Sequence, residues 1–119
     1  MSKIFIADDD LDILEILKMM LQTRGYQVEA TTNATDILNC NGDRPDLILL
    51  DLWMSGTDGR DIFTRLRQQE NTKKIPVIFI SANSRLKDIA AEYAVDDFIE
   101  KPFDMNFMLN KVKGILECS

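Results

Sequence analysis

The side chains able to do chemistry in this chain stand directly after short apolar runs. They are Asp8, Asp9, Asp51, Ser81 and Lys101. If those runs are parallel strands of one sheet, their carboxyl ends meet at one edge and these side chains lie together there. Carboxylates crowded in this way raise one another's pKa, so positive charge is needed among them if all are to stay ionised. The set therefore indicates a cation site to which Lys101 adds its own charge.

The chemistry open to such a set follows from its oxygen donors. Mg²⁺ prefers hard oxygen ligands, retains waters and often shares its coordination shell with phosphate oxygens. A carboxylate can also act as a nucleophile and form an aspartyl phosphate. Because phosphoryl transfer is catalysed mainly by positioning and electrostatics, we predict this reaction, with Asp51 as nucleophile and Ser81 and Lys101 on the phosphoryl oxygens.

Each of these residues also has a plainer interpretation. Asp8 to Asp10 could only cap a helix, since aspartate is a favoured N-cap and suits the positive end of the helix dipole. Asp51 could be a turn residue, Ser81 structural and Lys101 a solvated lysine. Their combination favours the site, with Asp10 as the helix cap. Asp58 is expected in a turn or helix start and not on the metal.

The elements that must position these side chains alternate between strand and helix five times. Strands are expected at 3–7, 26–30, 47–50, 77–80 and 95–99, and helices from 11, 33 or 35, 59, 86 and 104. The second helix is expected to break at 41–45. Leu11 and Phe107 are assigned to the apolar faces of the first and last helices. This alternation predicts an α/β fold with a parallel sheet, helices on both faces and right-handed crossovers.

Length and charge limit the classes of function. The chain has 119 residues, of which 45% are hydrophobic, which predicts one domain over residues 1–119. The net charge of −6 and the absence of a basic run argue against direct nucleic-acid binding.

Cysteine usage and apolar runs indicate the compartment. Cys40 and Cys118 are far apart and the chain has no histidine, so two reduced thiols are expected and not a zinc site or a disulfide. A strand pattern starts at Lys3 without a signal peptide, and no apolar run approaches the ~20 residues of a membrane span. A cytoplasmic protein without membrane contact is therefore expected.

Four motifs, in order along nearly the whole chain, resemble the receiver domain of two-component response regulators. They are residues 4–10 (IFIADDD), residues 46–59 (DLILLDLWMSGTDG), residues 76–82 (PVIFISA) and residues 101–103 (KPF). One motif alone is weak, whereas four at these spacings are specific. The resemblance implies a doubly wound, flavodoxin-like fold with strand order two-one-three-four-five, of which the order is taken partly from the family.

The resemblance also implies roles for individual residues. Asp51 would accept a phosphoryl group from a partner histidine kinase or histidine phosphotransfer protein, with Lys101 at the phosphate and the Lys101–Pro102 bond cis. The implied Mg²⁺ ligands are Asp9 and Asp51 directly, Asp8 through water, and the backbone carbonyl of Trp53.

The switch implied by the resemblance involves Ser81 and Phe98. Ser81 would turn toward the phosphoryl group and Phe98 inward behind it, reshaping the surface of helix 86–93, strand 95–99 and the last helix for a downstream protein target. The domain would catalyse only its own Mg²⁺-dependent phosphorylation and dephosphorylation. Phosphorylation-dependent homodimerisation is left open, as is whether the chain is a single-domain regulator or a fragment of a larger one.

Two positions depart from the family pattern. Ser55 stands where the family usually has proline, which bears on the rigidity of the loop but removes no reactive group. Phe98 lacks the hydroxyl of the tyrosine often found there, so a switch through ring packing is expected and one through that hydroxyl is excluded.

Other functions fit the sequence less well. A receiver-like interaction module that works without phosphate is the main alternative, although it has no use for the five polar residues. A haloacid-dehalogenase-type phosphatase usually needs a second aspartate where Trp53 stands. A flavin site is disfavoured because the first loop is acidic, and a P-loop is excluded because no GxxxxGK[ST] motif is present.

Overall fold

The computed structural model describes residues 2–39, 44–54 and 56–117. The predictions made for Cys40, Ser55 and Cys118, and for the helix break at 41–43, lie outside the described residues.

Five parallel strands form the central sheet. They are β1 (Lys3–Ala7), β2 (Gln27–Thr31), β3 (Leu47–Asp51), β6 (Val77–Ser81) and β7 (Asp97–Glu100). Their spatial order is β2-β1-β3-β6-β7, which is the predicted order two-one-three-four-five. The two strands that end in aspartates, β1 and β3, are direct neighbours and pair from Ile4 with Leu47 to Ala7 with Leu50.

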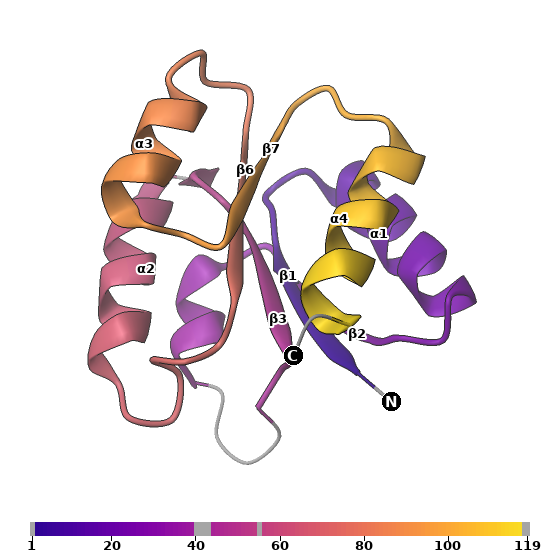
Figure 1. Ribbon diagram of the computed structural model, residues 1–119, viewed down its shortest axis with the longest axis horizontal. Helices are drawn as coiled ribbons and strands as arrows, with labels where there is room; N and C mark the ends of the chain where they lie inside the picture. The colour runs from indigo at the N-terminus through magenta and orange to yellow at the C-terminus, as the bar shows by residue number, and fades with distance from the viewer. Residues whose placement is uncertain (1, 40–43, 55, 118–119) are drawn as a thin grey trace.

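Helices cover both faces of the sheet, as predicted (Figure 1). The helices are α1 (Leu11–Thr23), the 3₁₀ helix η1 (Ala34–Asn39), α2 (Gly59–Gln68), α3 (Leu86–Tyr93) and α4 (Met105–Glu117). In Figure 1, α1 and α4 lie on one side of the sheet and η1, α2 and α3 on the other. No helix of the described residues is long and apolar enough to cross a membrane.

The sheet divides the core into two apolar clusters. In β3, Leu47 and Leu49 join the cluster under α1 and α4, whereas Ile48 and Leu50 join the one under η1, α2 and α3. Successive strand side chains point to opposite faces, so a strand covered on both sides must be apolar throughout. All five residues of β3 are buried, including Asp51 at its end.

The start of α1 confirms the predicted cap. The Asp10 carboxylate accepts hydrogen bonds from the backbone N–H groups of Asp12 (3.0 Å) and Ile13 (3.3 Å). These two donors have no partner inside the helix, because the first turn lacks the preceding carbonyls. Asp10 is therefore committed to the helix, which leaves Asp8 and Asp9 for the edge of the sheet.

The second predicted helix is present as the 3₁₀ helix η1, and Asn33 Oδ1 accepts from the Thr35 N–H at its start. Three other sequence predictions about elements were wrong. The fifth strand begins at Asp97 and not at residue 95, because Ala94 adopts φ 54° and the Val95 N–H donates to Ala90 O at the end of α3. Leu11 is 65% exposed because it stands at the first position of its helix. Phe107 is 51% exposed because Met108 and Leu109 occupy the buried face.

A short hairpin after β3 was not predicted. Its strands β4 (Trp53–Met54) and β5 (Thr57–Asp58) are antiparallel, and Trp53 pairs with Asp58. Gly56 between them has φ +81°, a conformation that favours glycine. The hairpin brings the chain back to the end of β3 before α2 begins.

Gly59, the first residue of α2, lies against the backbone of the acidic strand. A Cβ at this position would lie 2.8 Å from Asp51 O and 2.9 Å from Leu52 Cα. The Gly59 N–H also donates to Leu52 O at 2.7 Å. The absence of a side chain thus lets the helix start pack on the strand that carries Asp51.

We expect Gly59→Ala to lower the free energy of unfolding by about 1–3 kcal/mol, because only backbone atoms are near and they must shift. Gly114→Ala is the matched control: Gly114 is an exposed position of α4, and an added Cβ would meet no atom within 4 Å beyond its own helix backbone and chain neighbours, so alanine should stabilise by about 0.5–1 kcal/mol. Urea unfolding of both variants measures the difference, and equal changes would contradict the close packing at Gly59.

Candidate functional site

Three carboxylates gather at the carboxyl edge of the sheet. Asp8 and Asp9 follow β1 and Asp51 ends β3, and each offers an oxygen within 4.8 Å of the others. Asp8 is fully buried and Asp51 is 5% exposed, whereas Asp9 is exposed. The predicted cluster is therefore brought together, with two members inside the protein and one at the solvent.

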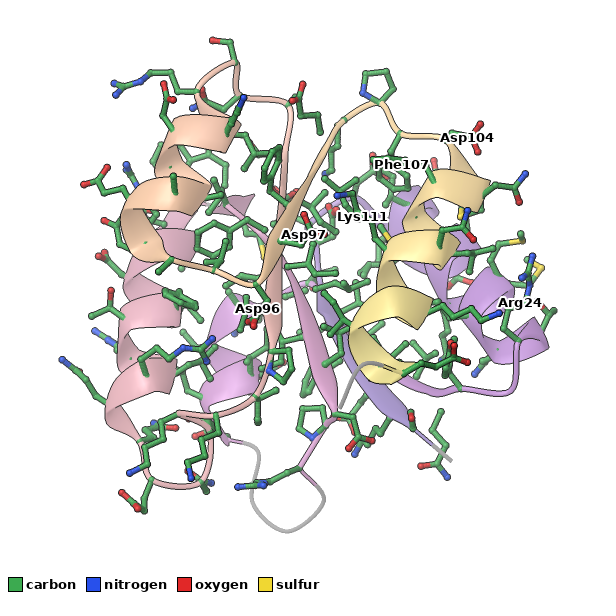
Figure 2. The ribbon with its side chains drawn as sticks, in the orientation of Figure 1. Arg24, Asp96, Asp97, Asp104, Phe107 and Lys111 are labelled. Atoms are coloured by element: carbon green, nitrogen blue, oxygen red, sulfur yellow. The ribbon has the colours of Figure 1, made fainter. Side chains whose placement is uncertain are left out.

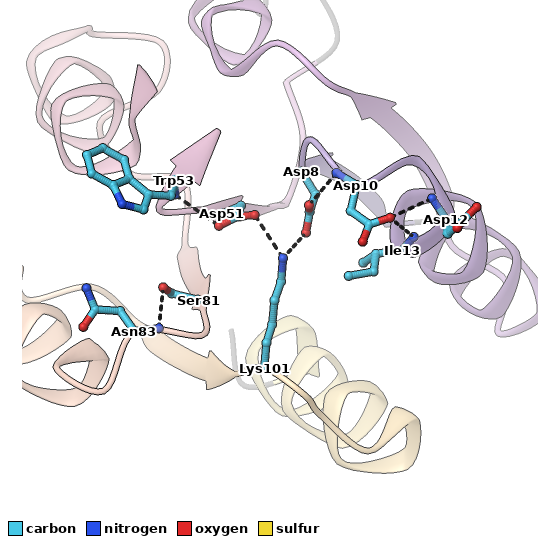
Figure 3. Close-up of polar contacts among 9 residues, drawn as sticks. All are labelled: Asp8, Asp10, Asp12, Ile13, Asp51, Trp53, Ser81, Asn83 and Lys101. Carbon is cyan, nitrogen blue, oxygen red and sulfur yellow. Dashed lines mark hydrogen bonds and ion pairs between the residues drawn. The ribbon is translucent and has the colours of Figure 1, made fainter. Parts of the chain in front are cut away.

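Lys101 joins the two buried carboxylates. Its Nζ donates to Asp8 Oδ2 at 2.8 Å and to Asp51 Oδ2 at 3.0 Å (Figure 3). The Lys101 backbone is fixed where the sheet ends, since its N–H donates to Ser81 O at 2.9 Å. The Lys101–Pro102 bond is cis, as predicted. An ammonium bridging two buried carboxylates offsets their repulsion and the cost of removing them from water.

Backbone donors hold the other oxygens of the two buried carboxylates. The Trp53 N–H donates to Asp51 Oδ1 at 3.2 Å, and the Asp10 N–H donates to Asp8 Oδ1 at 3.0 Å. Figure 3 shows both contacts, with Asp51 between Trp53 and Lys101. Each carboxylate is thereby fixed at both oxygens, and each oxygen keeps a lone pair for a further partner.

The electrostatics of the site favour a proton or a cation on Asp51. Burial raises the pKa of Asp51 to about 6, and the charge of Asp8 adds to the rise, although hydrogen bonds from Lys101 and Trp53 act against it. Burial alone would lower the pKa of Lys101, but its hydrogen bonds to Asp8 and Asp51 raise it overall. Lys101 therefore stays charged while the carboxylates beside it remain short of positive charge.

The donor set fits a magnesium ion. All three side chains are carboxylates, which are the hard oxygen ligands that Mg²⁺ selects. Exposed Asp9 lies at the solvent side, where an ion would keep several waters. The ligand role predicted for the Trp53 carbonyl stays a prediction, since the recorded contact of this residue with Asp51 is through its N–H.

The two predicted switch residues lie on neighbouring strands, two positions out of register. Ser81 ends β6 and is 6% exposed, and its Oγ accepts a hydrogen bond from the Asn83 N–H at 3.0 Å. Phe98 lies in β7, half-buried at the margin of the apolar cluster under α2 and α3. Strand pairing places Phe98 beside Phe79 and Ser81 beside Glu100.

An ion pair beside the site was not predicted. Asp58 caps α2 by accepting from the Arg60 N–H at 2.9 Å, and its carboxylate also binds the Arg60 guanidinium, with Nη2 2.7 Å from Oδ2. The hydrogen bonds from Arg60 and its positive charge hold the pKa of Asp58 below its usual value. The helix-start role expected for Asp58 is confirmed, whereas its pairing with Arg60 was missed.

Fold and site together define a class of protein. The sheet is doubly wound, and its topological switch point, where β1 and β3 are neighbours, carries an acidic pocket suited to a divalent cation and closed by one lysine. A sequence model described as the response regulator receiver domain matches residues 4–113. The chain belongs to this family.

Known relatives agree with this assignment. The nisin biosynthesis regulatory protein NisR of Lactococcus lactis subsp. lactis is 39% identical over 117 residues, covering 94% of this chain and 49% of NisR. The DNA-binding dual master transcriptional regulator RpaA of Synechocystis is 34% identical over 119 residues, covering 98% of this chain and 49% of RpaA. The chain thus spans about half the length of these curated relatives.

A solved structure extends the likeness to three dimensions. The response regulator TrrA of Thermotoga maritima, crystallised in complex with Mg²⁺-BeF, is 30% identical with a TM-score of 0.85. The match covers 98% of this chain and all of TrrA.

We expect Asp51→Asn to stabilise the metal-free protein at about pH 7.5. The raised pKa of Asp51 means that its ionisation costs folding free energy, a cost that is absent below its unfolded pKa of about 4 and complete above about pH 6. The variant should gain on the order of 1–3 kcal/mol in EDTA at about pH 7.5, and much less at about pH 4.5.

Thermal unfolding at the two pH values measures this gain. Asp9→Asn is the control, because its carboxylate is exposed and should give a smaller gain. Excess MgCl₂ should stabilise the wild type more than Asp51→Asn, since binding to the folded state alone adds stability. A pH-independent difference between Asp51→Asn and the wild type would contradict the proposed cost.

Proposed function

We propose that this chain is a phosphorylation-dependent signalling switch that accepts a phosphoryl group on Asp51 from a partner histidine kinase or phosphohistidine protein. The observation that carries the proposal is the buried pair Asp8 and Asp51, bridged by Lys101 beside the exposed carboxylate of Asp9. A structural ion pair needs neither a third carboxylate nor a charge deficit at the solvent edge. The family assignment supports the same conclusion.

In the proposed reaction an Asp51 carboxylate oxygen attacks phosphorus. The bond between phosphorus and the donor's imidazole nitrogen breaks, and that nitrogen leaves with the bonding electron pair. Asp9, Asp51 and the Trp53 carbonyl would hold a Mg²⁺ ion, with Asp8 acting through water, and the ion would neutralise charge on the phosphoryl oxygens. Lys101 then donates a hydrogen bond to a phosphoryl oxygen in place of one of its bonds to the carboxylates. Ser81 donates a hydrogen bond from its hydroxyl to another phosphoryl oxygen.

A protein donor has a surface to contact beside Asp51. An apolar groove of about 400 Å³ begins at Lys101 and runs between α1 and the start of α4. Ile13 and Ile16 line one wall, and Phe103 and Met105 the other. Such a groove supports a donor presented by a protein, because a small phosphate ester has no apolar surface to bury.

The proposed output passes through Ser81 and Phe98 to α3, β7 and α4. Lys111 of α4 pairs with Asp97 of β7 at 2.9 Å, and its Nζ lies 5.7 Å from the ring centre of Phe98 and 5.0 Å from that of Phe107. Figure 2 shows Asp97, Lys111 and Phe107 gathered between β7 and α4. Inward motion of Phe98 would withdraw one of the rings that Lys111 contacts and so change this surface.

Residues 1–119 form one receiver domain in this proposal. Its partners are the phosphodonor protein and a downstream protein, and phosphorylation-dependent homodimerisation belongs to the same surface. DNA binding is described for RpaA, of which this chain covers half, and we assign none to residues 1–119. A cytoplasmic location and catalysis limited to its own phosphorylation and dephosphorylation complete the proposal.

We expect acetyl phosphate with Mg²⁺ to add one phosphoryl group to the wild type and none to Asp51→Asn, because the nucleophilic carboxylate is absent from the variant. Intact-protein mass spectrometry at neutral pH measures the addition. Asp12→Asn, an exposed acid in the first turn of α1, is the control and should be labelled like the wild type. An unlabelled wild type would favour the phosphate-independent interaction module.

We expect Lys101→Met to slow this labelling by roughly 100-fold or more, since a preorganised positive group at the phosphoryl oxygens is lost. The same change leaves Asp8 and Asp51 without their ammonium, so Mg²⁺ should bind more tightly. Labelling kinetics and a fluorescence titration of Trp53 with MgCl₂ measure the two effects. Weaker Mg²⁺ binding together with slow labelling would indicate a collapsed site and contradict the assigned role.

A further inference from the structure

A small cleft opens between the residues that follow Asp51 and the end of β6. Arg60 and Asp58 line it together with Trp53, Ser81 and Asn83, and its volume is about 60 Å³. It lies between the hairpin, the start of α2 and the loop that follows β6. Ser81 is one of its walls, so a group bound near the Ser81 hydroxyl faces this cleft.

The backbone of Arg60 is fixed close to the strand that carries Asp51. The preceding residue, Gly59, is so near that a Cβ there would lie 2.8 Å from Asp51 O. Its N–H donates to Leu52 O at 2.7 Å. The first turn of α2 therefore holds the guanidinium beside the site on a rigid element.

Asp58 restrains the Arg60 side chain. Arg60 Nε lies 3.0 Å from Asp58 Oδ1 and 3.1 Å from Oδ2, and Nη2 lies 2.7 Å from Oδ2. The side chains of Arg60 and Asp58 are 39% and 24% exposed, and ion pairs this accessible to solvent are weak. Asp58 would still cap α2 through the Arg60 N–H if the guanidinium turned away.

The positive charge of the Arg60 guanidinium would attract an anion to this site. Three carboxylates and one lysine give the cluster a formal charge of −2, and Lys101 is already hydrogen-bonded to two of those carboxylates. A bound Mg²⁺ would bring this cluster to formal neutrality, so an approaching phosphoryl anion would meet no net attraction from it. Arg60 is the cationic side chain among the described residues that line the cleft, and its fork suits phosphate oxygens.

We propose that Arg60 is an anion-recruiting residue of this site, which exchanges the Asp58 carboxylate for the oxygens of a small phosphoryl donor entering the cleft. This inference rests on the proposed function and adds a route for small phosphodonors. Arg60 raises the local concentration of the anion, and the chemical step stays with Asp51 and Lys101.

The test measures labelling of Asp51 against acetyl phosphate concentration at constant Mg²⁺ and constant ionic strength. In this reaction an Asp51 oxygen bonds to phosphorus, the bond from phosphorus to the acetyl oxygen breaks, and acetate leaves with the electron pair. Arg60→Gln should raise the half-saturating concentration roughly five- to tenfold and leave the maximal rate within about twofold. Asp58→Asn, which keeps a good helix cap, should lower that concentration by freeing Arg60.

Two further variants isolate the guanidinium. Asp58→Asn combined with Arg60→Gln removes both charges, so its half-saturating concentration should exceed that of Asp58→Asn alone. Arg65→Gln is the matched control, since Arg65 is an exposed arginine on the same helix and should behave like the wild type. Circular dichroism melts confirm that each variant is folded, and Arg60→Lys, with charge but no fork, should fall between Arg60→Gln and wild type.

Phosphoramidate separates charge from other effects. It carries less negative charge than acetyl phosphate at neutral pH and has the phosphorus–nitrogen bond of phosphohistidine, so Arg60→Gln should affect it less. If Arg60→Gln raised the half-saturating concentration of phosphoramidate as much as or more than that of acetyl phosphate, recruitment by charge would be overturned. The proposal would also be overturned if Arg60→Gln labelled like Arg65→Gln, or if it lowered only the maximal rate. If the wild type is not labelled at all, the proposed function fails and this inference with it.

Discussion

The ammonium of Lys101 between Asp8 and Asp51 is the interaction on which the site depends. Asp8 is fully buried and Asp51 nearly so, and two neighbouring carboxylates cannot both stay ionised there without a positive partner. Lys101 supplies one charge for the two, and Asp9 adds another negative group at the solvent. Lys101 thus offsets enough repulsion for the protein to fold with these acids buried. The cluster still carries excess negative charge, which favours the binding of a cation.

The parallel sheet makes this interaction feasible. Asp8 and Asp51 meet because β1 and β3 are paired neighbours that end at the same level, and Lys101 arrives from the other side because β7 also ends at this edge. Rigid strands fix the two buried acids, whereas the hairpin and Arg60 occupy the rim. The acidic residues thus stand at the strand ends, with the hairpin and the start of α2 around them.

The features of this arrangement that follow from the periodicity of the strands could be predicted from the sequence. The apolar run 47–50 ending in Asp51 predicted a strand buried on both faces, and the order of the five strands followed from alternation together with the family resemblance. Asp10 as helix cap followed from known capping preferences. The same reasoning placed Lys101 among the carboxylates, but not the two hydrogen bonds of its Nζ to Asp8 and Asp51, because these depend on how the last loop lies against the sheet.

The remaining misses have local causes. Phe107 matches a helical apolar spacing, yet Met108 and Leu109 fill the buried face of α4. The Phe107 ring stays at the surface, where the Lys111 ammonium lies over it. The hairpin has strands of two residues, too short for any periodicity to show. The Asp58–Arg60 pair was not predicted because side chains two positions apart in a helix do not usually face each other. The contact forms here because Asp58 is the N-cap of α2, and its carboxylate lies at the Arg60 N–H.

The most direct measurement of the central claim locates the acyl phosphate. The protein is treated with acetyl phosphate and Mg²⁺, the acyl phosphate is reduced with borohydride, and the resulting homoserine is found by peptide mapping. The account predicts homoserine at position 51 alone, because Asp51 ends β3 next to the strand that carries Ser81, whereas Asp8 is fully buried and Asp9 lies at the solvent. Homoserine at position 8 or 9, or at none, would contradict it.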